Sequence, residues 1–253
     1  MPIRKALAAV LFLGLSAATA MAGEKINIAT DATFPPFESI DSNGKLVGYD
    51  IELMKAVCAA AKLDCNIFNA AWDGMIPGLV DGKYDALISQ LTVTDQRRKI
   101  IAFSDIYEHP IFRFVAKKGA QFDFTPQGLK GKTIAVQTGT PMDAYVTHHF
   151  PGAIIKRYDS GSTPYLDLAA GRADLVISYQ AQILYGFLKT PEGKGFSLVG
   201  PELTGKDAKE FGAGVAIAIN KKNTKLLDEV NKGLATIREN GTLKAINEKY
   251  FGK

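Results

Sequence analysis

The chain has 253 residues, of which 47% are hydrophobic and 22% are charged, and its formal net charge is +4. Without residues 1–22, which contain Arg4 and Lys5, the charge is +2, too weak to indicate nucleic acid or an anionic membrane surface as a partner. The remaining 231 residues could form one large domain or two of about 100 residues each.

Residues 1–22 have the pattern of a secretory signal peptide. A positively charged start is followed by an apolar run over 6–18 and by the small-x-small cleavage signature Ala20-Met21-Ala22. A transmembrane anchor is the alternative, but the run is shorter than the ~20 residues that a span requires. A lipoprotein would need a cysteine where Ala22 or Gly23 stands. The sequence therefore predicts export to the periplasm and a soluble mature chain.

Cys58 and Cys65 are the only cysteines, and in an exported protein such a pair suggests one disulfide. Within a straight helix, residues seven apart lie about 10 Å from each other, too far for a disulfide. Residues 62–64 have the pattern of a helix end and turn, which would bring the two together. Two buried free thiols are the alternative, and without a nearby histidine a metal site is not expected.

Strand and helix patterns alternate along the chain, which is typical of α/β proteins. In the first part we expect strands over 25–29, 65–68 and 86–91, and helices over 51–58 (with Asp50 as N-cap) and 73–81. In the second part we expect a strand over 132–137, a helix over 142–149, alternating segments over 154–158, 165–170, 173–178 and 182–188, a strand over 214–219, and helices over 225–238 and around 243–250.

These patterns predict two similar α/β lobes, each a sheet flanked by helices. The extended, apolar segments 113–116 and 212–219 are the candidate crossovers between them. The expected boundaries place 23–110 together with 212–253 in lobe 1, and 111–211 in lobe 2.

Candidate ligand-binding residues follow the expected strands, where open α/β sheets place their ligands. Asp31 and Phe34 come just after the first strand, and the alternatives for them are a turn cap and ordinary core packing. Arg97 follows the polar run after strand 86–91, and its guanidinium could hold a carboxylate with two hydrogen bonds. The alternative for Arg97 is a solvated surface residue, which we expect for its neighbour Arg98.

A possible anion site in the second half is the turn Gly139-Thr140-Pro141, which closes a strand and opens a helix. A carboxylate could lie between Arg97 and this turn, and a plain turn is the alternative. Trp72 could stack on a planar cation or be an ordinary buried residue. There is no Walker A loop, Gly-x-Ser-x-Gly elbow or Cys-x-x-Cys pair, and His148-His149 has no acidic partner at metal-ligand spacing. We therefore expect a binding protein rather than an enzyme, with no cofactor and no metal.

Several short sequence motifs, in a specific order along the chain, indicate a resemblance to a known family. The chain resembles the periplasmic amino-acid-binding proteins of bacterial ABC importers, close to the lysine/arginine/ornithine-, histidine- and opine-binding branch. The matching runs cover nearly all the mature chain and are Asp31-x-x-Phe34-x-Pro36-Phe37-Glu38, Gly48-Tyr49-Asp50-Ile51, the Cys58 and Cys65 positions, Trp72-Asp73-Gly74-Met75-Ile76-Pro77, Tyr84-Asp85-Ala86, Thr94-x-x-Arg97, Ile101-Ala102-Phe103-Ser104, Gly139-Thr140 and Ala170-Gly171-Arg172-x-Asp174.

The resemblance implies a type II periplasmic-binding-protein fold, with two α/β lobes joined by two hinge crossovers around a ligand cleft. It also implies a role for each candidate residue. Arg97, Thr92 and Thr140 would bind the ligand's α-carboxylate, and Ser89 and the backbone of Gln90 would form the first lobe's side of the cleft. Phe34 and Trp72 would sandwich the ligand side chain. Asp31 would bind its distal positive group.

Tyr179 departs from the family pattern. Cationic amino-acid binders usually have an Asp at this position, after strand 173–178, to pair with the ligand's α-ammonium. The α-amino group of the ligand would then be substituted, as in opines, or held by neutral acceptors.

The resemblance further implies an ABC permease in the inner membrane as the partner. A role as ligand sensor for a chemoreceptor is compatible with import. A cyclohexadienyl-type dehydratase on the same fold is the enzymatic alternative, for which Asp31 would be the catalytic acid.

Overall fold

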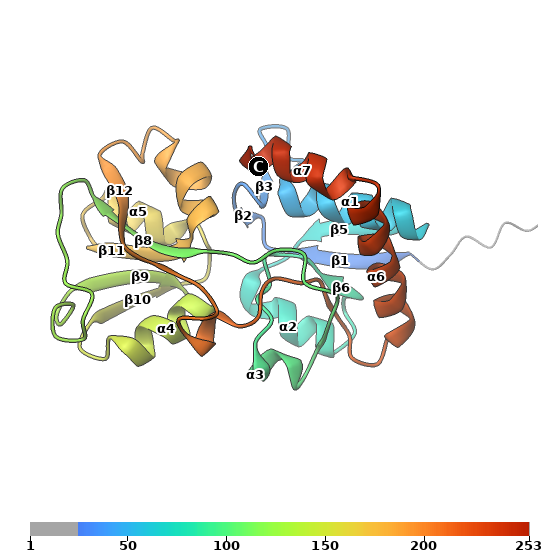
Figure 1. Cartoon of the computed structure of the whole chain (residues 1–253), viewed down its shortest axis with the longest axis horizontal. Helices are drawn as coiled ribbons and strands as arrows, with labels where there is room; N and C mark the ends of the chain where they lie inside the picture. The colour runs from blue at the N-terminus through green and yellow to red at the C-terminus, as the bar shows by residue number, and fades with distance from the viewer. Residues whose placement is uncertain (1–24, 253) are drawn as a thin grey trace, which may run out of the picture.

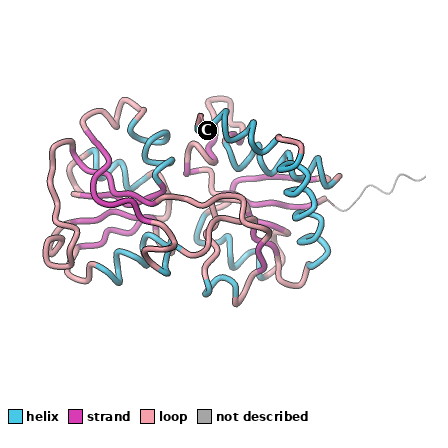
Figure 2. The backbone as a smooth tube through the Cα atoms, viewed as in Figure 1, coloured by secondary structure: helices cyan, strands magenta, loops and turns pink. Residues whose placement is uncertain are grey.

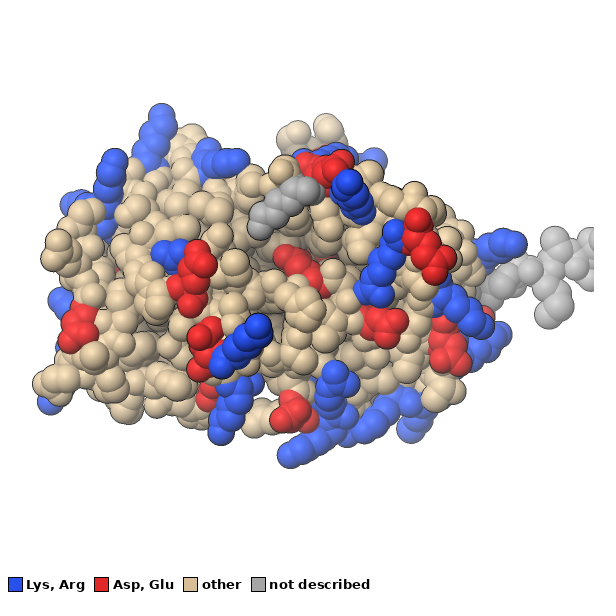
Figure 3. Space-filling view, viewed as in Figure 1, with Lys and Arg blue, Asp and Glu red and all other residues tan. Residues whose placement is uncertain are grey.

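The structure is a computed structural model that describes residues 25–252, so the predicted signal peptide lies outside the described residues. Two α/β lobes lie side by side and are joined by extended segments (Figure 1), with strands inside and helices outside in each (Figure 2). No helix within 25–252 is long and apolar enough to cross a membrane. Acidic and basic side chains are interspersed on the face shown in Figure 3, as the small net charge leads one to expect.

Lobe 1 is built on a five-stranded sheet with the order β5-β1-β6-β13-β7. Its first three strands are parallel, and β13 is antiparallel to both of its neighbours. The strands are β1 (Ile26–Thr30), β5 (Cys65–Asn69), β6 (Ala86–Leu87), β7 (Ala102–Phe103) and β13 (Ala218–Ile219). The helices are α1 (Tyr49–Ala61), α2 (Trp72–Val80), α3 (Asp95–Arg98), α6 (Thr224–Glu239) and α7 (Thr242–Phe251), and a small separate sheet holds β2 (Thr33–Phe34), β3 (Glu38–Ile40) and β4 (Leu46–Val47).

Lobe 2 repeats this plan with the strand order β10-β9-β11-β8-β12. The strands are β8 (Phe112–Lys117), β9 (Thr133–Gln137), β10 (Ile154–Tyr158), β11 (Leu175–Tyr179) and β12 (Phe196–Leu203). The helices are α4 (Pro141–His149), α5 (Thr163–Ala169), the π-helix η1 (Gln182–Leu188) and the short 3₁₀-helix η2 (Lys209–Phe211). The fold class expected from the sequence is confirmed.

The chain crosses between the lobes twice, after β7 and again before β13. The two crossings pair with each other through a bridge between Glu108 and Val215. The prediction that 113–116 is a crossover is wrong, because those residues lie inside β8, between β11 and β12. We propose that the lobes divide within these crossings, at the boundaries that the sequence predicts.

The end of α1 brings the two cysteines together, and the predicted disulfide between Cys58 and Cys65 is confirmed. The helix ends at Ala61, and Lys62 adopts a left-handed conformation with φ 56°. The two cysteine Cα atoms are therefore 6.2 Å apart, well within the range of a disulfide.

The start of α1 corrects a second prediction. Asp50 is not its N-cap, since that position belongs to Gly48, which has φ 131°. A Cβ atom at Gly48 would lie 2.1 Å from the carbonyl oxygen of Phe37, so only glycine fits there. Asp50 is instead fully buried in the first turn of α1 and bonds to Gln90.

Candidate ligand-binding site

A narrow cavity lies between the lobes. Eight of the nine residues predicted to bind ligand line it, and they come from both lobes: Asp31, Phe34, Trp72, Ser89, Gln90, Arg97, Thr140 and Tyr179. The ninth, Thr92, is fully buried behind the wall and touches two of the lining residues. Strand ends that are far apart in sequence therefore meet at one place.

Among residues 25–252, Arg97 is the only basic residue that lines this cavity. Its side chain is buried and donates hydrogen bonds to the carbonyl oxygens of Thr92, at 3.0 Å, and of Gly139 in lobe 2, at 3.3 Å. The guanidinium carbon lies 5.6 Å from the centre of the Trp72 ring. No Asp or Glu among residues 25–252 forms an ion pair with it.

Burial lowers the pKa of Arg97 to about 10, so its guanidinium is still charged at neutral pH. Neutral carbonyls and an aromatic face do not cancel that charge, and a buried cation without a counter-ion is unfavourable. The Arg97 end of the cavity therefore suits an anion.

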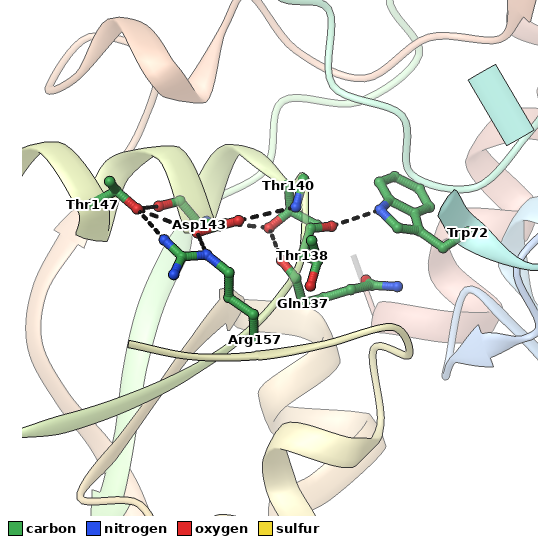
Figure 4. Close-up of polar contacts among 8 residues, drawn as sticks. Trp72, Gln137, Thr138, Thr140, Asp143, Thr147 and Arg157 are labelled. Atoms are coloured by element: carbon green, nitrogen blue, oxygen red, sulfur yellow. Dashed lines mark hydrogen bonds and ion pairs between the residues drawn. The ribbon is translucent and has the colours of Figure 1, made fainter. Parts of the chain in front are cut away.

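The start of α4 forms part of the lobe 2 wall through Thr140, Pro141 and Met142. Figure 4 shows the polar contacts around Thr140. The Thr140 hydroxyl accepts a hydrogen bond from the Asp143 N–H and donates one to the Gln137 carbonyl, and so caps the helix. The Asp143 carboxylate in the first turn accepts a hydrogen bond from the Gly139 N–H at 3.0 Å, so the positive end of the helix dipole already has an anionic partner. Trp72 of lobe 1 donates its indole N–H to the Thr138 carbonyl at 2.9 Å, which ties the two lobes together.

Asp31 provides the charged acceptor elsewhere in the cavity. Its carboxylate accepts hydrogen bonds from Thr33 and, across the cleft, from Gln137 at 2.9 Å. Burial raises its pKa, and the hydrogen bonds from Gln137 and Thr33 oppose that rise. Within residues 25–252, Asp31 and Arg97 share no hydrogen-bond partner, since Asp31 accepts from Thr33 and Gln137 whereas Arg97 donates to Thr92 and Gly139. The cavity therefore has two separate poles of opposite charge.

Beneath Ser89 and Gln90 lies a buried pair of carboxyl groups, Glu38 and Asp50. Asp50 accepts hydrogen bonds from both nitrogens of Gln90 and from Tyr107, whereas Glu38 accepts one from Ser89. Burial and the neighbouring Asp50 raise the pKa of Glu38 well above its usual range, so Glu38 carries a proton and donates it to Asp50. Burial raises the pKa of Asp50 to about 6 against the opposing hydrogen bonds.

Sequence reasoning missed three lining residues: Glu38, Gln137 and Met142. Pro141 also lines the cavity and belongs to the turn predicted as an anion site. Gln137 ends β9 just before that turn, so the strand-end rule could have found it. Glu38 is the first residue of the short strand β3, and no local pattern indicates that it lines the cavity.

Residues 26–253 match the sequence family described as bacterial extracellular solute-binding proteins, family 3. The chain belongs to this family.

Curated relatives of this family 3 solute-binding protein extend over nearly its whole length. The L-arginine-binding protein of Pseudomonas aeruginosa is 37% identical over 97% of this chain and 95% of its own length. The lysine/arginine/ornithine-binding periplasmic protein of Escherichia coli is also 37% identical, with the same coverage. Among solved structures, an arginine-specific periplasmic binding protein of Salmonella typhimurium is similar with a TM-score of 0.82, at 29% identity over 90% of this chain and 99% of that one.

The carboxyl pair predicts that this solute-binding protein becomes more stable as the pH is lowered from 7.5 to 5. A carboxyl group whose pKa is raised by folding stabilises the fold when protonated, and that stability is lost as the pH rises through the folded pKa. For Asp50, a rise from 3.8 to about 6 corresponds to roughly 1 kcal/mol between pH 7.5 and pH 5, and Glu38 acts in the same direction. Urea unfolding of the ligand-free protein at both pH values measures the difference.

Glu38→Gln is the matched control, because the amide can still donate to Asp50 and accept from Ser89 but takes up no proton. Its gain in stability on acidification should be smaller than that of the wild type. Equal slopes for the two proteins, or a wild type that loses stability over this range, would contradict the protonated pair.

Proposed function

We propose that this protein is the solute-binding component of an ABC importer and that it captures a cationic, arginine-like amino acid or derivative, such as an opine, in the periplasm. The observation that carries the proposal is the pair of separated poles in the cavity. Arg97 is a buried cation without an acidic partner in the described chain, and the Asp31 carboxyl group lines the same cavity. A ligand with a carboxylate and a distal cation satisfies both.

The side chains that line the cavity suit a ligand with a planar cation. Phe34 and Trp72 add aromatic faces to the carboxylate of Asp31, a combination that suits a guanidinium. The names of the curated relatives, which include binding proteins for arginine, lysine and ornithine, agree with this ligand class. Those relatives are also named as binding proteins, and we propose that this chain likewise binds its ligand without converting it.

The proposed partner is an inner-membrane permease that accepts the ligand from the closed protein. Closure is supported by hydrogen bonds that cross the cleft, from Arg97 to Gly139, from Trp72 to Thr138 and from Gln137 to Asp31. Because these groups line the cavity or adjoin it, ligand binding and lobe closure would act together.

Arg97→Ala should weaken binding of arginine-like ligands by at least about 2 kcal/mol. The substitution leaves the ligand carboxylate buried without a charged partner, which is costly. Arg98→Ala is the control, since Arg98 is the next residue along the chain but is exposed. Isothermal titration calorimetry with both variants decides the matter, and equally small losses would remove Arg97 from the site.

Asp31→Asn should weaken cationic ligands far more than neutral ones, because it keeps the shape of the side chain and removes its charge. Calorimetry with arginine, lysine, glutamine and glutamate on wild type and variant measures this difference. Glutamine or glutamate binding tighter than every cationic candidate would show that Asp31 serves the fold and not the ligand.

A further inference from the structure

The end of the last helix, α7, contacts lobe 2 at a place outside the ligand cavity. The hydroxyl of Tyr185, in η1, donates a hydrogen bond to the carbonyl oxygen of Phe251 at 3.2 Å, and the two rings pack edge to face with centroids 5.9 Å apart. The last four carbonyls of a helix have no partner within the helix, so the Phe251 carbonyl can accept from another element. Neither residue lines the ligand cavity. The contact therefore joins the two lobes without being part of the ligand site.

Phe251 is fixed to the body of lobe 1. Its ring packs against Tyr49 of α1, with centroids 5.0 Å apart, and against Phe37 at 5.7 Å. The residue before it, Tyr250, donates its hydroxyl to the Glu52 carboxylate of α1 at 2.7 Å. The end of α7 is therefore a firmly packed part of lobe 1, and a contact that it makes with lobe 2 restrains the whole lobe.

Tyr185 is held equally well in lobe 2. It lies in a π-helix, a rare form that is frequent at functional sites, although no residue of this helix lines the ligand cavity. Gln182, the first residue of the helix, donates to the Gly161 carbonyl and accepts from the Tyr165 hydroxyl. The ammonium of Lys189 lies 3.9 Å from the centre of the Tyr185 ring. The π-helix therefore presents Tyr185 to α7 from a fixed position.

Opening of the cleft would separate the two residues. Gly186 follows Tyr185, and a Cβ atom on Gly186 would lie 2.3 Å from the carbonyl oxygen of Pro35. Pro35 in turn follows Phe34, which lines the ligand cavity. A second cavity is lined by both sides of the contact and by residues 108–111 of the first crossing, so the contact is set away from the hinge. A hinge motion that moves Phe34 away from lobe 2 would therefore also move α7 away from Tyr185.

We propose that Tyr185 and Phe251 form a latch that stabilises the closed conformation and slows the release of ligand without contacting it. The inference rests on the proposed function, because it assumes that the ligand is enclosed between the lobes. An enclosed ligand leaves only after the lobes part, and their parting breaks the latch. The latch therefore acts on the rate of dissociation, whereas association begins from the open protein, in which the latch is not formed.

The test uses Tyr185→Phe, which removes the hydroxyl and keeps the ring, and Tyr185→Ala, which removes both contacts. Trp72 is the only tryptophan and its indole bonds to lobe 2, so its fluorescence reports closure in stopped-flow experiments with arginine. The dissociation rate should rise about threefold in Tyr185→Phe and about tenfold in Tyr185→Ala. The association rate should stay unchanged in both, which a general loss of structure would not produce.

Tyr250→Phe is the matched control, because it makes the same chemical change beside Phe251 but removes a bond within lobe 1. It should lower thermal stability and leave the dissociation rate as in the wild type. Equal dissociation rates in the wild type and both Tyr185 variants, or a control that releases ligand as fast as Tyr185→Phe, would overturn the latch. The comparison of rates can equally be made with glutamine, so a failure of arginine to bind would count against the proposed function and not against the latch.

Discussion

The buried guanidinium of Arg97 is the group on which the organisation of the cleft depends. It keeps its charge at neutral pH although burial lowers its pKa to about 10, and the described part of the chain gives it no acidic partner. Its hydrogen bonds go to the carbonyls of Thr92 in one lobe and Gly139 in the other. An anion bound here would compensate the charge at the junction of the lobes, so the same contact that selects the ligand also favours closure.

Two glycines of lobe 2 allow the lobes to approach as closely as they do. A Cβ atom on Gly161 would lie 2.5 Å from the ring of Phe34, and one on Gly186 would lie 2.3 Å from the carbonyl oxygen of Pro35. A side chain at either position would push the lobes apart. The aromatic wall of the cavity therefore reaches its place because the facing lobe presents bare backbone to it.

Much of the site could be predicted because strand ends of an α/β fold meet at one edge. Asp31 and Ser89 follow β1 and β6, which are parallel neighbours, and their meeting is a consequence of local patterns alone. The position of Arg97 along the chain, a short distance after β6, also allowed it to be predicted over the cleft. Local patterns could not show the partner of Asp31 across the cleft, because Gln137, which donates a hydrogen bond to its carboxylate, lies 106 residues away.

The errors have one physical source, which is long-range pairing. Asp50 precedes an amphipathic run and so has the pattern of an N-cap, but its partner is Gln90, 40 residues further along the chain. Residues 113–116 are extended and apolar, as a crossover would be, yet they are a central strand with partners on both sides. The predicted strand 86–91 ends at Leu87, after which the chain leaves the sheet to form the cavity wall.

A crystal structure of the protein with its tightest-binding guanidino carboxylate would test the central claim most directly. The account predicts that the ligand carboxylate lies within hydrogen-bond distance of the Arg97 guanidinium, and that the guanidinium of the ligand lies against Asp31 between Phe34 and Trp72. A ligand bound in the reverse orientation, or one whose carboxylate makes no contact with Arg97, would contradict it.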